Sequence, residues 1–348
     1  MWGYVLGTMT AVEASPSPVS LPVPHLEAEL NFQRKAALAH GGAVDHAGRV
    51  HVSPARRFDL GRTIFGRLQG TLPRLMMKDK LGKDVFWSDA AVAEIEAAYA
   101  LSEKSQPTPP VDADLVSFMV EGCDFSMEHA DGTFLEHLVF CHDYAVKYFP
   151  GHSAKVALLH SILGTATNTF PMPIARWPSL KERLTDFEAL HIEAFPSVLR
   201  LFYDQQLLSE LGRNLHRLDR LEALHCHRVI DDAPLAIDAE NLWIQLNYHL
   251  MHFVDFMPAA NWGARLSDPL LRQFRELSAF LDRAGQRRAK VDVAFPEHMS
   301  LPTGETATVI GRVATVLPPR VTTVLARKTI RRYSELAGHS LDYRLEWR

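Results

Sequence analysis

The sequence predicts an all-α protein, and three observations support this prediction. Apolar residues recur at helical spacing in most segments, for example over residues 239–256. Thr133 is followed three residues later by Glu136, a pattern typical of a capping box at a helix start. Ser179 and Glu182 repeat that pattern. The chain also lacks the GxGxxG and GxSxG patterns, which removes the common enzyme classes that carry them.

Changes in composition divide the chain into four regions. Four prolines and three serines in residues 11–24 predict an extended arm. A second proline-rich stretch, residues 105–112, predicts a linker that precedes the central domain. The predicted regions are an arm over 1–25, an N-terminal helical extension over 26–110, a helical core over 111–260 and a C-terminal extension over 261–348.

The two extensions give weaker signals than the core. Residues 59–75 and 88–103 carry apolar residues at helical spacing, and Ser88 is expected to act as the N-cap of the second stretch. Residues 305–324 are rich in Val and Thr and contain two consecutive prolines. That composition leaves both strand and helix open in the C-terminal region.

The core is expected to begin with a helical hairpin. Its first helix runs from Thr133 to Phe149, and a turn follows over residues 150–153. Ser153 is expected to cap a second helix, which ends at Gly164. Because the turn is short, the two helices are expected to pack side by side.

Three further helical stretches are expected after the hairpin. A long helix begins at the Ser179 capping box and is expected to be interrupted near Pro196, which cannot donate a backbone hydrogen bond. Helical spacing continues over residues 198–228. A last strong helix opens at Asp238 or Ala239 and ends before Pro258.

Composition excludes several classes of function. The net charge of -4 over 348 residues does not favour nucleic-acid binding, and no apolar run is long enough to span a membrane. The three cysteines form no CxxC pair, which favours a reducing compartment and a cytoplasmic location. Of the 17 histidines, eleven lie within residues 129–252, so proton-transfer or metal chemistry is expected there.

His137 and His160 are the leading candidates for that chemistry. Each lies near the middle of one helix of the predicted hairpin, so antiparallel packing brings their rings to the same level. Two adjacent imidazoles can share a metal ion or exchange a proton. The alternative is that each is a core histidine bonded to a carbonyl group.

The segment around these histidines resembles the HD superfamily, which includes phosphohydrolases and diiron oxygenases such as myo-inositol oxygenase. Those proteins carry a histidine on one helix and a segment like Leu-Leu-His-Asp-Ile-Gly on the next. In this chain the corresponding residues 158–164 read Leu-Leu-His-Ser-Ile-Leu-Gly. The segment 129–170 is most similar to an uncharacterised HD-like family with His-Ser or His-Ala at that place, followed by Gly-Thr. The resemblance covers about 120 residues, from His129 to Gln245. It implies an HD-like helical fold.

Ser161 stands where the resemblance implies a metal-ligating aspartate. Since a hydroxyl is a poor substitute for a carboxylate, a dinuclear centre is not expected. His142 and Asp143 do form a His-Asp dipeptide, but they lie mid-helix without the aliphatic run that surrounds His160. Adjacent helical residues point about 100° apart, so an exposed charged edge is the favoured interpretation of that dipeptide.

The last strong helix carries a polar stripe on an otherwise apolar surface. The stripe comprises Asn241, Gln245, His249 and His252, at positions i, i+4, i+8 and i+11. It either faces solvent or closes a polar cavity beside His137. In the second case Asn241 and Gln245 are the expected substrate contacts, and the later Asp255 takes the place of the last aspartate of HD proteins.

Further candidates complete the predicted site. His129 precedes the first helix of the hairpin and is predicted as a third catalytic residue or ligand. Thr165 and Tyr144 are predicted substrate contacts, with a capped turn and a core aromatic as their alternatives. His225 and His227 diverge by about 200° if they are helical, so a shared ion is expected only if that segment is extended.

Two functions of different classes follow. The favoured one is an HD-like enzyme acting on a small molecule, in which His137, His160 and His129 are catalytic. His137 and His160 then hold one divalent ion (Fe, Mn or Zn), or act without metal as acid and base; an iron-dependent oxygenase is a further variant. The other is a non-catalytic binding protein on a degenerate HD scaffold, whose flanks serve homo-oligomerisation or partner docking.

Overall fold

A computed structural model describes part of the chain, and all structural statements below concern that part. The described residues are 43–44, 49–52, 60–63, 65–81, 85–88, 111–125, 134–255, 269–291, 303–304 and 317–348. The predicted arm, His129 and the capping Thr133 lie outside these ranges. The predicted domain bounds therefore stay predictions.

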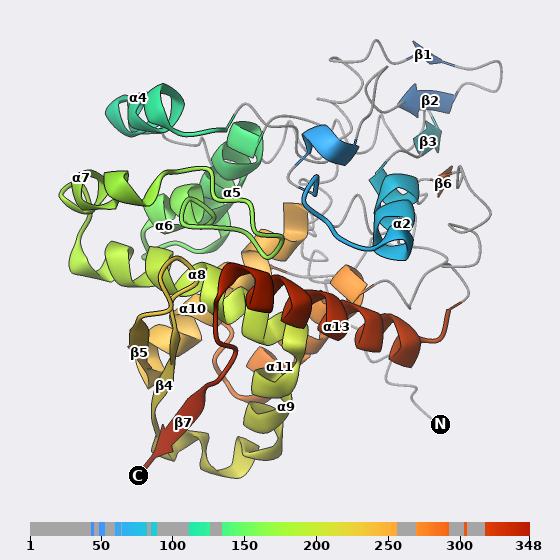
Figure 1. Cartoon of the computed structure of the whole chain (residues 1–348). Helices are drawn as coiled ribbons and strands as arrows, with labels where there is room; N and C mark the ends of the chain where they lie inside the picture. The colour runs from blue at the N-terminus through green and yellow to red at the C-terminus, as the bar shows by residue number, and fades with distance from the viewer. Residues whose placement is uncertain are drawn as a thin grey trace, which may run out of the picture.

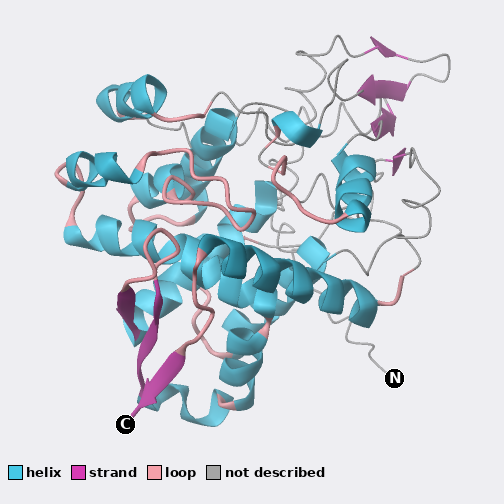
Figure 2. Ribbon diagram, viewed as in Figure 1, coloured by secondary structure: helices cyan, strands magenta, loops and turns pink. Residues whose placement is uncertain are grey.

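The described residues are mostly helical, as predicted, but they include two small sheets that an all-α fold does not (Figure 1, Figure 2). The α-helices are α2 (Thr71–Leu81), α4 (Ala113–Gly122), α5 (Phe134–Tyr148), α6 (Ala154–Leu159), α7 (Trp177–Lys181), α8 (Asp186–Asp204), α9 (Gln206–Arg213), α10 (Ala239–Asp255), α11 (Pro269–Arg283) and α13 (Pro319–Ala337). The 3-10 helices are η1 (Leu60–Arg62), η2 (Ile174–Arg176) and η3 (Leu215–Arg220). The strands are β1 (Ala43–Val44), β2 (Arg49–Val52), β3 (Val85–Ser88), β4 (Leu221–His227), β5 (Pro234–Asp238), β6 (Thr303–Gly304) and β7 (Arg344–Trp347).

The predicted hairpin forms from α5 and α6. Helix α5 has nearly the expected bounds, and Gly151, with φ of 86°, allows the tight turn that follows it. Helix α6 is shorter than predicted, because it ends at Leu159 and His160 is its C-cap. Gly164, with φ of 134°, instead closes the turns after the helix. Ser153 occupies the N-cap position, but its hydroxyl donates to Glu188 rather than capping α6.

Helix α8 corrects two expectations. Its capping box is formed by Thr185 and Glu188, whereas Ser179 lies inside α7 and Glu182 follows it. Glu188 Oε2 accepts from the Thr185 amide at 2.8 Å, which satisfies one of the free N–H groups at the helix start. Pro196 lies within α8 and does not interrupt it. Fifteen residues of α8 are buried, and this packing offsets the cost of an interior proline.

Residues 221–227 were wrongly predicted to be helical, because they form strand β4. Strand β4 pairs with β5 on one side and with the C-terminal strand β7 on the other, both antiparallel. Leu224 lies opposite Ile237 of β5 and Leu345 of β7, and its side chain is fully buried. The partner β7 lies more than a hundred residues away, so helical spacing within the segment could not reveal it.

The extensions also depart from expectation. In the N-terminal region, residues 60–81 include η1 and α2, while β1, β2, β3 and β6 form a second antiparallel sheet. Ser88 ends strand β3, and the stretch that it was expected to cap lies outside the described residues. The ambiguity over the C-terminal region resolves partly to helix, since α13 begins at Pro319. The rest of the Val- and Thr-rich stretch before 317 is outside the described residues.

Helix α13 lies across α8 and ties the C-terminal extension to the core (Figure 1). The buried Asp204 at the end of α8 accepts from Arg331 at 2.6 Å and from Arg327 at 3.3 Å. The hairpin α5–α6 contributes to both hydrophobic clusters of the described chain, so polar groups on its inner face lie in the deep interior. None of the described helices has the length and apolar character needed to cross a membrane.

Candidate metal centre

Three helices bring four potential metal ligands together in the interior. His137 and Cys141 lie on one face of α5, because they are four residues apart. His160 follows α6, and His252 lies in the last turn of α10. All four side chains are buried, with exposed fractions between 1 and 6 %. We call these four residues the His/Cys cluster.

The ligand atoms of the cluster converge on one point. Nε2 of His137 lies 3.2 Å from Nε2 of His160, and Sγ of Cys141 lies 3.9 Å from that same His137 nitrogen. The His252 ring centroid is 4.6 Å from that of His160 and 5.4 Å from that of His137. One ligand atom from each of the four residues fits within a mutual separation of 4.8 Å. This convergence is what a single ion requires.

The separations are close to those of tetrahedral zinc. With metal–nitrogen bonds of about 2.05 Å, tetrahedral coordination sets two nitrogens about 3.3 Å apart, close to the 3.2 Å between His137 and His160. A metal–sulfur bond of about 2.3 Å sets sulfur and nitrogen about 3.6 Å apart, so Cys141 would move by a few tenths of an ångström. The widest pair, within 4.8 Å, would close by up to about 1.5 Å.

The backbone selects the tautomer of a neutral His160 ring. Nδ1 of His160 lies 2.6 Å from the carbonyl oxygen of Ala157, so Nδ1–H must donate there. The lone pair of the ring is therefore on Nε2, which faces His137. A bond from the second ring nitrogen to a carbonyl is typical of histidines that bind metals, because it fixes the ring orientation. Without an ion, Nε2–H of His137 can donate to this lone pair.

The sequence identified half of this cluster. The structure places His137 and His160 side by side, while their roles as ligands or catalysts stay predictions. Cys141 was passed over, although its i+4 spacing from His137 was a usable signal. His252 was noted only as part of the polar stripe, because nothing local shows that its end of α10 meets the hairpin.

The polar stripe of α10 faces the interior rather than solvent. Gln245 and His249 are fully buried, and Asn241 is half-buried. Asn241 and Gln245 bind His191 of α8 instead of lining a cavity at the cluster: their side-chain oxygens lie 3.1 and 2.6 Å from the two ring nitrogens. The side-chain nitrogen of Gln245 lies 3.4 Å from Nε2 of His249. The expected substrate contacts therefore hold a second buried histidine.

Hydrogen bonding constrains the charge of His191. Asn241 Nδ2 donates to Asp238 at 2.7 Å, which turns its oxygen toward Nε2 of His191, so Nε2–H donates. If Nδ1 also donates to Gln245, the ring is cationic; if the Gln245 amide is turned by 180°, the ring is neutral. Burial lowers the pKa of His191, which favours the neutral ring. Burial also lowers the pKa of His249 well below its ordinary value, and the neighbouring His160 adds to this.

The other two predicted substrate contacts, Thr165 and Tyr144, form local structural contacts. The Thr165 hydroxyl accepts from the Thr169 amide at 3.1 Å and so stabilises its own turn. The Tyr144 ring stacks on Phe140 and packs against Tyr148, as expected for a core aromatic. Tyr144 also lies one turn after Cys141 on α5, in the same hydrophobic core, and its role as a substrate contact stays a prediction. His129 and the Asp255 side chain lie outside the described part of the chain.

The two alternative histidine motifs behave differently from expectation. His142 Nδ1–H donates to Asp143 Oδ1 at 2.9 Å, but the His142 side chain is mostly buried, which corrects the expected exposed edge. His225 and His227 lie on a strand, so they share one face of the sheet. His225 bonds to Glu346 of β7 at 2.5 Å, and no third ligand accompanies the pair in the described residues.

Comparisons with known proteins add no relative. No family model, no curated protein and no solved structure matches this chain.

Proposed function

We propose that this protein is a metalloprotein that binds one divalent ion through His137, Cys141, His160 and His252. The observation that carries the proposal is the convergence of three imidazoles and one thiol within 4.8 Å, in an interior that excludes water. Polar groups buried in this way are costly unless they are hydrogen-bonded or bind an ion. A shared ion would satisfy all four at once.

The donor set favours zinc among the three candidate metals. Imidazole nitrogen and thiolate sulfur are the preferred ligands of Zn²⁺, whereas Mn²⁺ prefers carboxylate oxygens. No carboxylate of the described residues joins the cluster, and Ser161 offers only a hydroxyl. Mononuclear iron is the remaining alternative, and we propose zinc ahead of it.

A closed, stabilising site is the role we propose first. Four protein ligands complete a tetrahedral shell, and structural zinc sites have this property, whereas catalytic sites keep a position for water or substrate. The ion would link α5, the end of α6 and α10. Catalysis on a small molecule within an HD-like fold stays a proposal, supported by the meeting of His137 and His160 across the hairpin.

One observation favours a second, metal-free candidate. The direct contact of 3.2 Å between His137 and His160 would let the two rings exchange a proton, as an acid–base pair does. In that case Cys141 and His252 would contribute only packing. The two candidates therefore differ in what they require of Cys141.

Elemental analysis of the purified full chain tests the proposal. We expect about one zinc per chain, and a loss of most of it in His252→Gln and Cys141→Ser. The matched control is His249→Gln, which alters a fully buried histidine one turn earlier on the same helix, outside the cluster. Failure of the wild-type chain to bind zinc, iron or manganese after reconstitution would contradict the proposal.

Cobalt substitution separates the two candidates. Co²⁺ bound by a thiolate gives an intense sulfur-to-metal absorption in the near ultraviolet, and tetrahedral Co²⁺ gives strong visible bands. We expect Cys141→Ser to lose the near-ultraviolet band. A Co²⁺ complex whose spectrum is the same in wild type and Cys141→Ser would exclude the four-ligand site.

A further inference from the structure

Arg200 of α8 is an uncommon residue for a protein interior. Its side chain has an exposed fraction of 0 % and is the largest of the fully buried side chains in the described chain. Burial lowers the pKa of Arg200 to about 10, so the guanidinium is still charged at neutral pH. A buried charge is costly unless an opposite charge accompanies it.

Neutral acceptors alone contact the guanidinium. Nη1 donates to Ser334 Oγ at 3.2 Å, and Nη2 donates to the Thr165 carbonyl at 3.0 Å and to Asn168 Oδ1 at 2.6 Å. Within the described residues, no carboxylate forms an ion pair with Arg200, and its Nε–H has no acceptor. Asp204, one turn later on α8, is already paired with Arg331 and Arg327.

Two further buried polar groups lie near Arg200 among the described residues, and neither is an anion. Asp232 raises the pKa of His339 but forms no ion pair with Arg200 in the described structure. Ser197, one turn before Arg200, is fully buried, and its hydroxyl has no hydrogen-bond partner among the described groups. His339 is also buried, and burial together with the nearby Arg200 lowers its pKa to about 4. A neutral His339 removes a second positive charge but supplies no negative one.

We propose that Arg200 is the core of a binding site for a small monovalent anion of the size of chloride. The anion would accept the Nε–H of Arg200 and neutralise the guanidinium. The Nε edge of Arg200 has no hydrogen-bond partner in the described structure, and the fully buried position favours a small, weakly hydrated ion over a phosphate. This site is independent of the His/Cys cluster.

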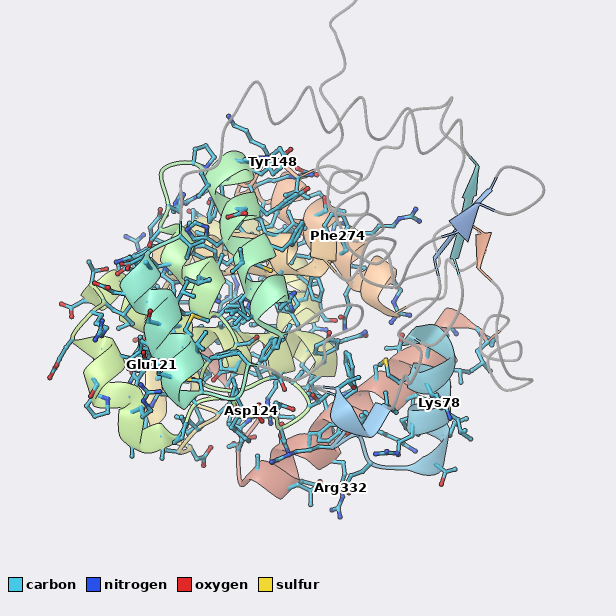
Figure 3. All side chains as sticks on the ribbon, turned by 90° about the horizontal axis from the view of Figure 1, so that it is seen from above. Lys78, Glu121, Asp124, Tyr148, Phe274 and Arg332 are labelled. Carbon is cyan, nitrogen blue, oxygen red and sulfur yellow. The ribbon has the colours of Figure 1, made fainter. Side chains whose placement is uncertain are left out.

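A surface groove is lined by continuations of both segments that contact Arg200. The loop that carries Thr165 and Asn168 continues to Phe170, and α13 continues from Ser334 to Ala337. Phe170 and Ala337 both line an open groove of about 750 Å³, whose rim includes Glu121 and Asp124, the residues labelled in Figure 3. None of the described members of the His/Cys cluster lines this groove.

Thermal unfolding in matched salts tests the proposal. The full chain is dialysed free of chloride, and Tm is followed as sodium chloride replaces sodium gluconate at constant ionic strength. We expect a saturable rise in Tm of about 2–4 °C, because an ion that binds only the folded state stabilises it. Equal Tm values in the two salts would overturn the proposal, since they would show that water alone satisfies Arg200.

Variants locate the effect. Asn168→Asp places a carboxylate within 2.6 Å of the guanidinium, at a residue whose φ of 59° aspartate tolerates. It is expected to lose the chloride response, as is Arg200→Met. Arg228→Met is the matched control, because Arg228 already bonds to Glu193 and Asp231, and it should keep the response. A full response in Asn168→Asp would contradict the proposal even if Arg200→Met fails to fold.

Bromide provides a direct readout. Crystals of the full chain soaked in sodium bromide are expected to show an anomalous peak within about 3.5 Å of Arg200 Nε. Peaks confined to the surface would mean an adventitious ion only, and would overturn the assignment.

Discussion

The two halves of the α10 polar stripe, Asn241 and Gln245 at its start and His249 and His252 at its end, lie on one helix but meet different partners. At the start of the helix, Asn241 and Gln245 present amide groups to His191, and an amide can donate or accept to match either ring nitrogen. At the end, His252 meets two imidazoles and a thiol. Imidazole nitrogens and a thiolate that converge in this way can share one metal ion, which amide groups rarely do. Residues at regular helical spacing therefore need not have the same role. The helix that each residue contacts decides whether it forms hydrogen bonds or belongs to the His/Cys cluster.

Metal removal is expected to give the largest difference between the two halves. If the ion links α5, α6 and α10, chelation should lower Tm by about 10 °C, since metal binding adds to folding free energy. Gln245→Ala should retain this chelator-dependent shift, because its bonds lie with His191. Differential scanning calorimetry with and without chelator measures both. If the chelator left the Tm of the wild type unchanged, a stabilising metal ion at the His/Cys cluster would be contradicted.

A substitution among the amide residues at the start of the stripe is expected to lower stability less than metal removal does. Gln245→Ala leaves a nitrogen of the buried His191 unsatisfied and should lower the free energy of unfolding by about 2 kcal/mol. Its zinc content should equal that of the wild type. Chemical denaturation measures the stability change, and elemental analysis of the same samples measures the zinc content. A loss of zinc in Gln245→Ala would mean that the start and the end of the stripe are coupled.

In the metal-depleted protein, acid is expected to lower stability through His191, the histidine that Asn241 and Gln245 contact. Burial lowers the pKa of folded His191 from the ordinary 6.5, so the unfolded chain takes up the proton more readily. Its contribution to stability is complete above about pH 6.5 and is lost as the pH falls below that value. His191→Gln should therefore flatten the fall of the unfolding free energy in this range. A pH profile that this substitution leaves unchanged would show that folding does not shift the pKa of His191, and would contradict this prediction.

The smallest effect is expected at the His-Asp dipeptide. Asp143 is 41 % exposed and bonds only to His142 in the described contacts. Asp143→Asn should change the unfolding free energy by less than about 0.5 kcal/mol and leave the zinc content unchanged. Elemental analysis that found reduced zinc in this variant would restore the dipeptide as a candidate ligand pair.

Local signals determined the α5–α6 hairpin and α10. A Pro-Gly turn separates two apolar periodic stretches, and α10 is bounded by Asp238 and Pro258, so no distant contact was needed to recognise these helices. From the hairpin alone it followed that His137 and His160 meet. The HD-like resemblance of the same segment stays a proposal.

Tertiary structure decided the rest, because the competing local signals were nearly equal in energy. Ser179 and Thr185 both begin capping patterns, but only Thr185 precedes the face that packs into the core. Strand β4 exists because β5 on one side, and β7 from the far end of the chain on the other, supply its hydrogen-bond partners. In the same way, only the packing of α10 against the hairpin brings His252 to Cys141. The sequence by itself determined which histidines could meet within one hairpin, and the tertiary structure determined which other ligand atoms complete the cluster.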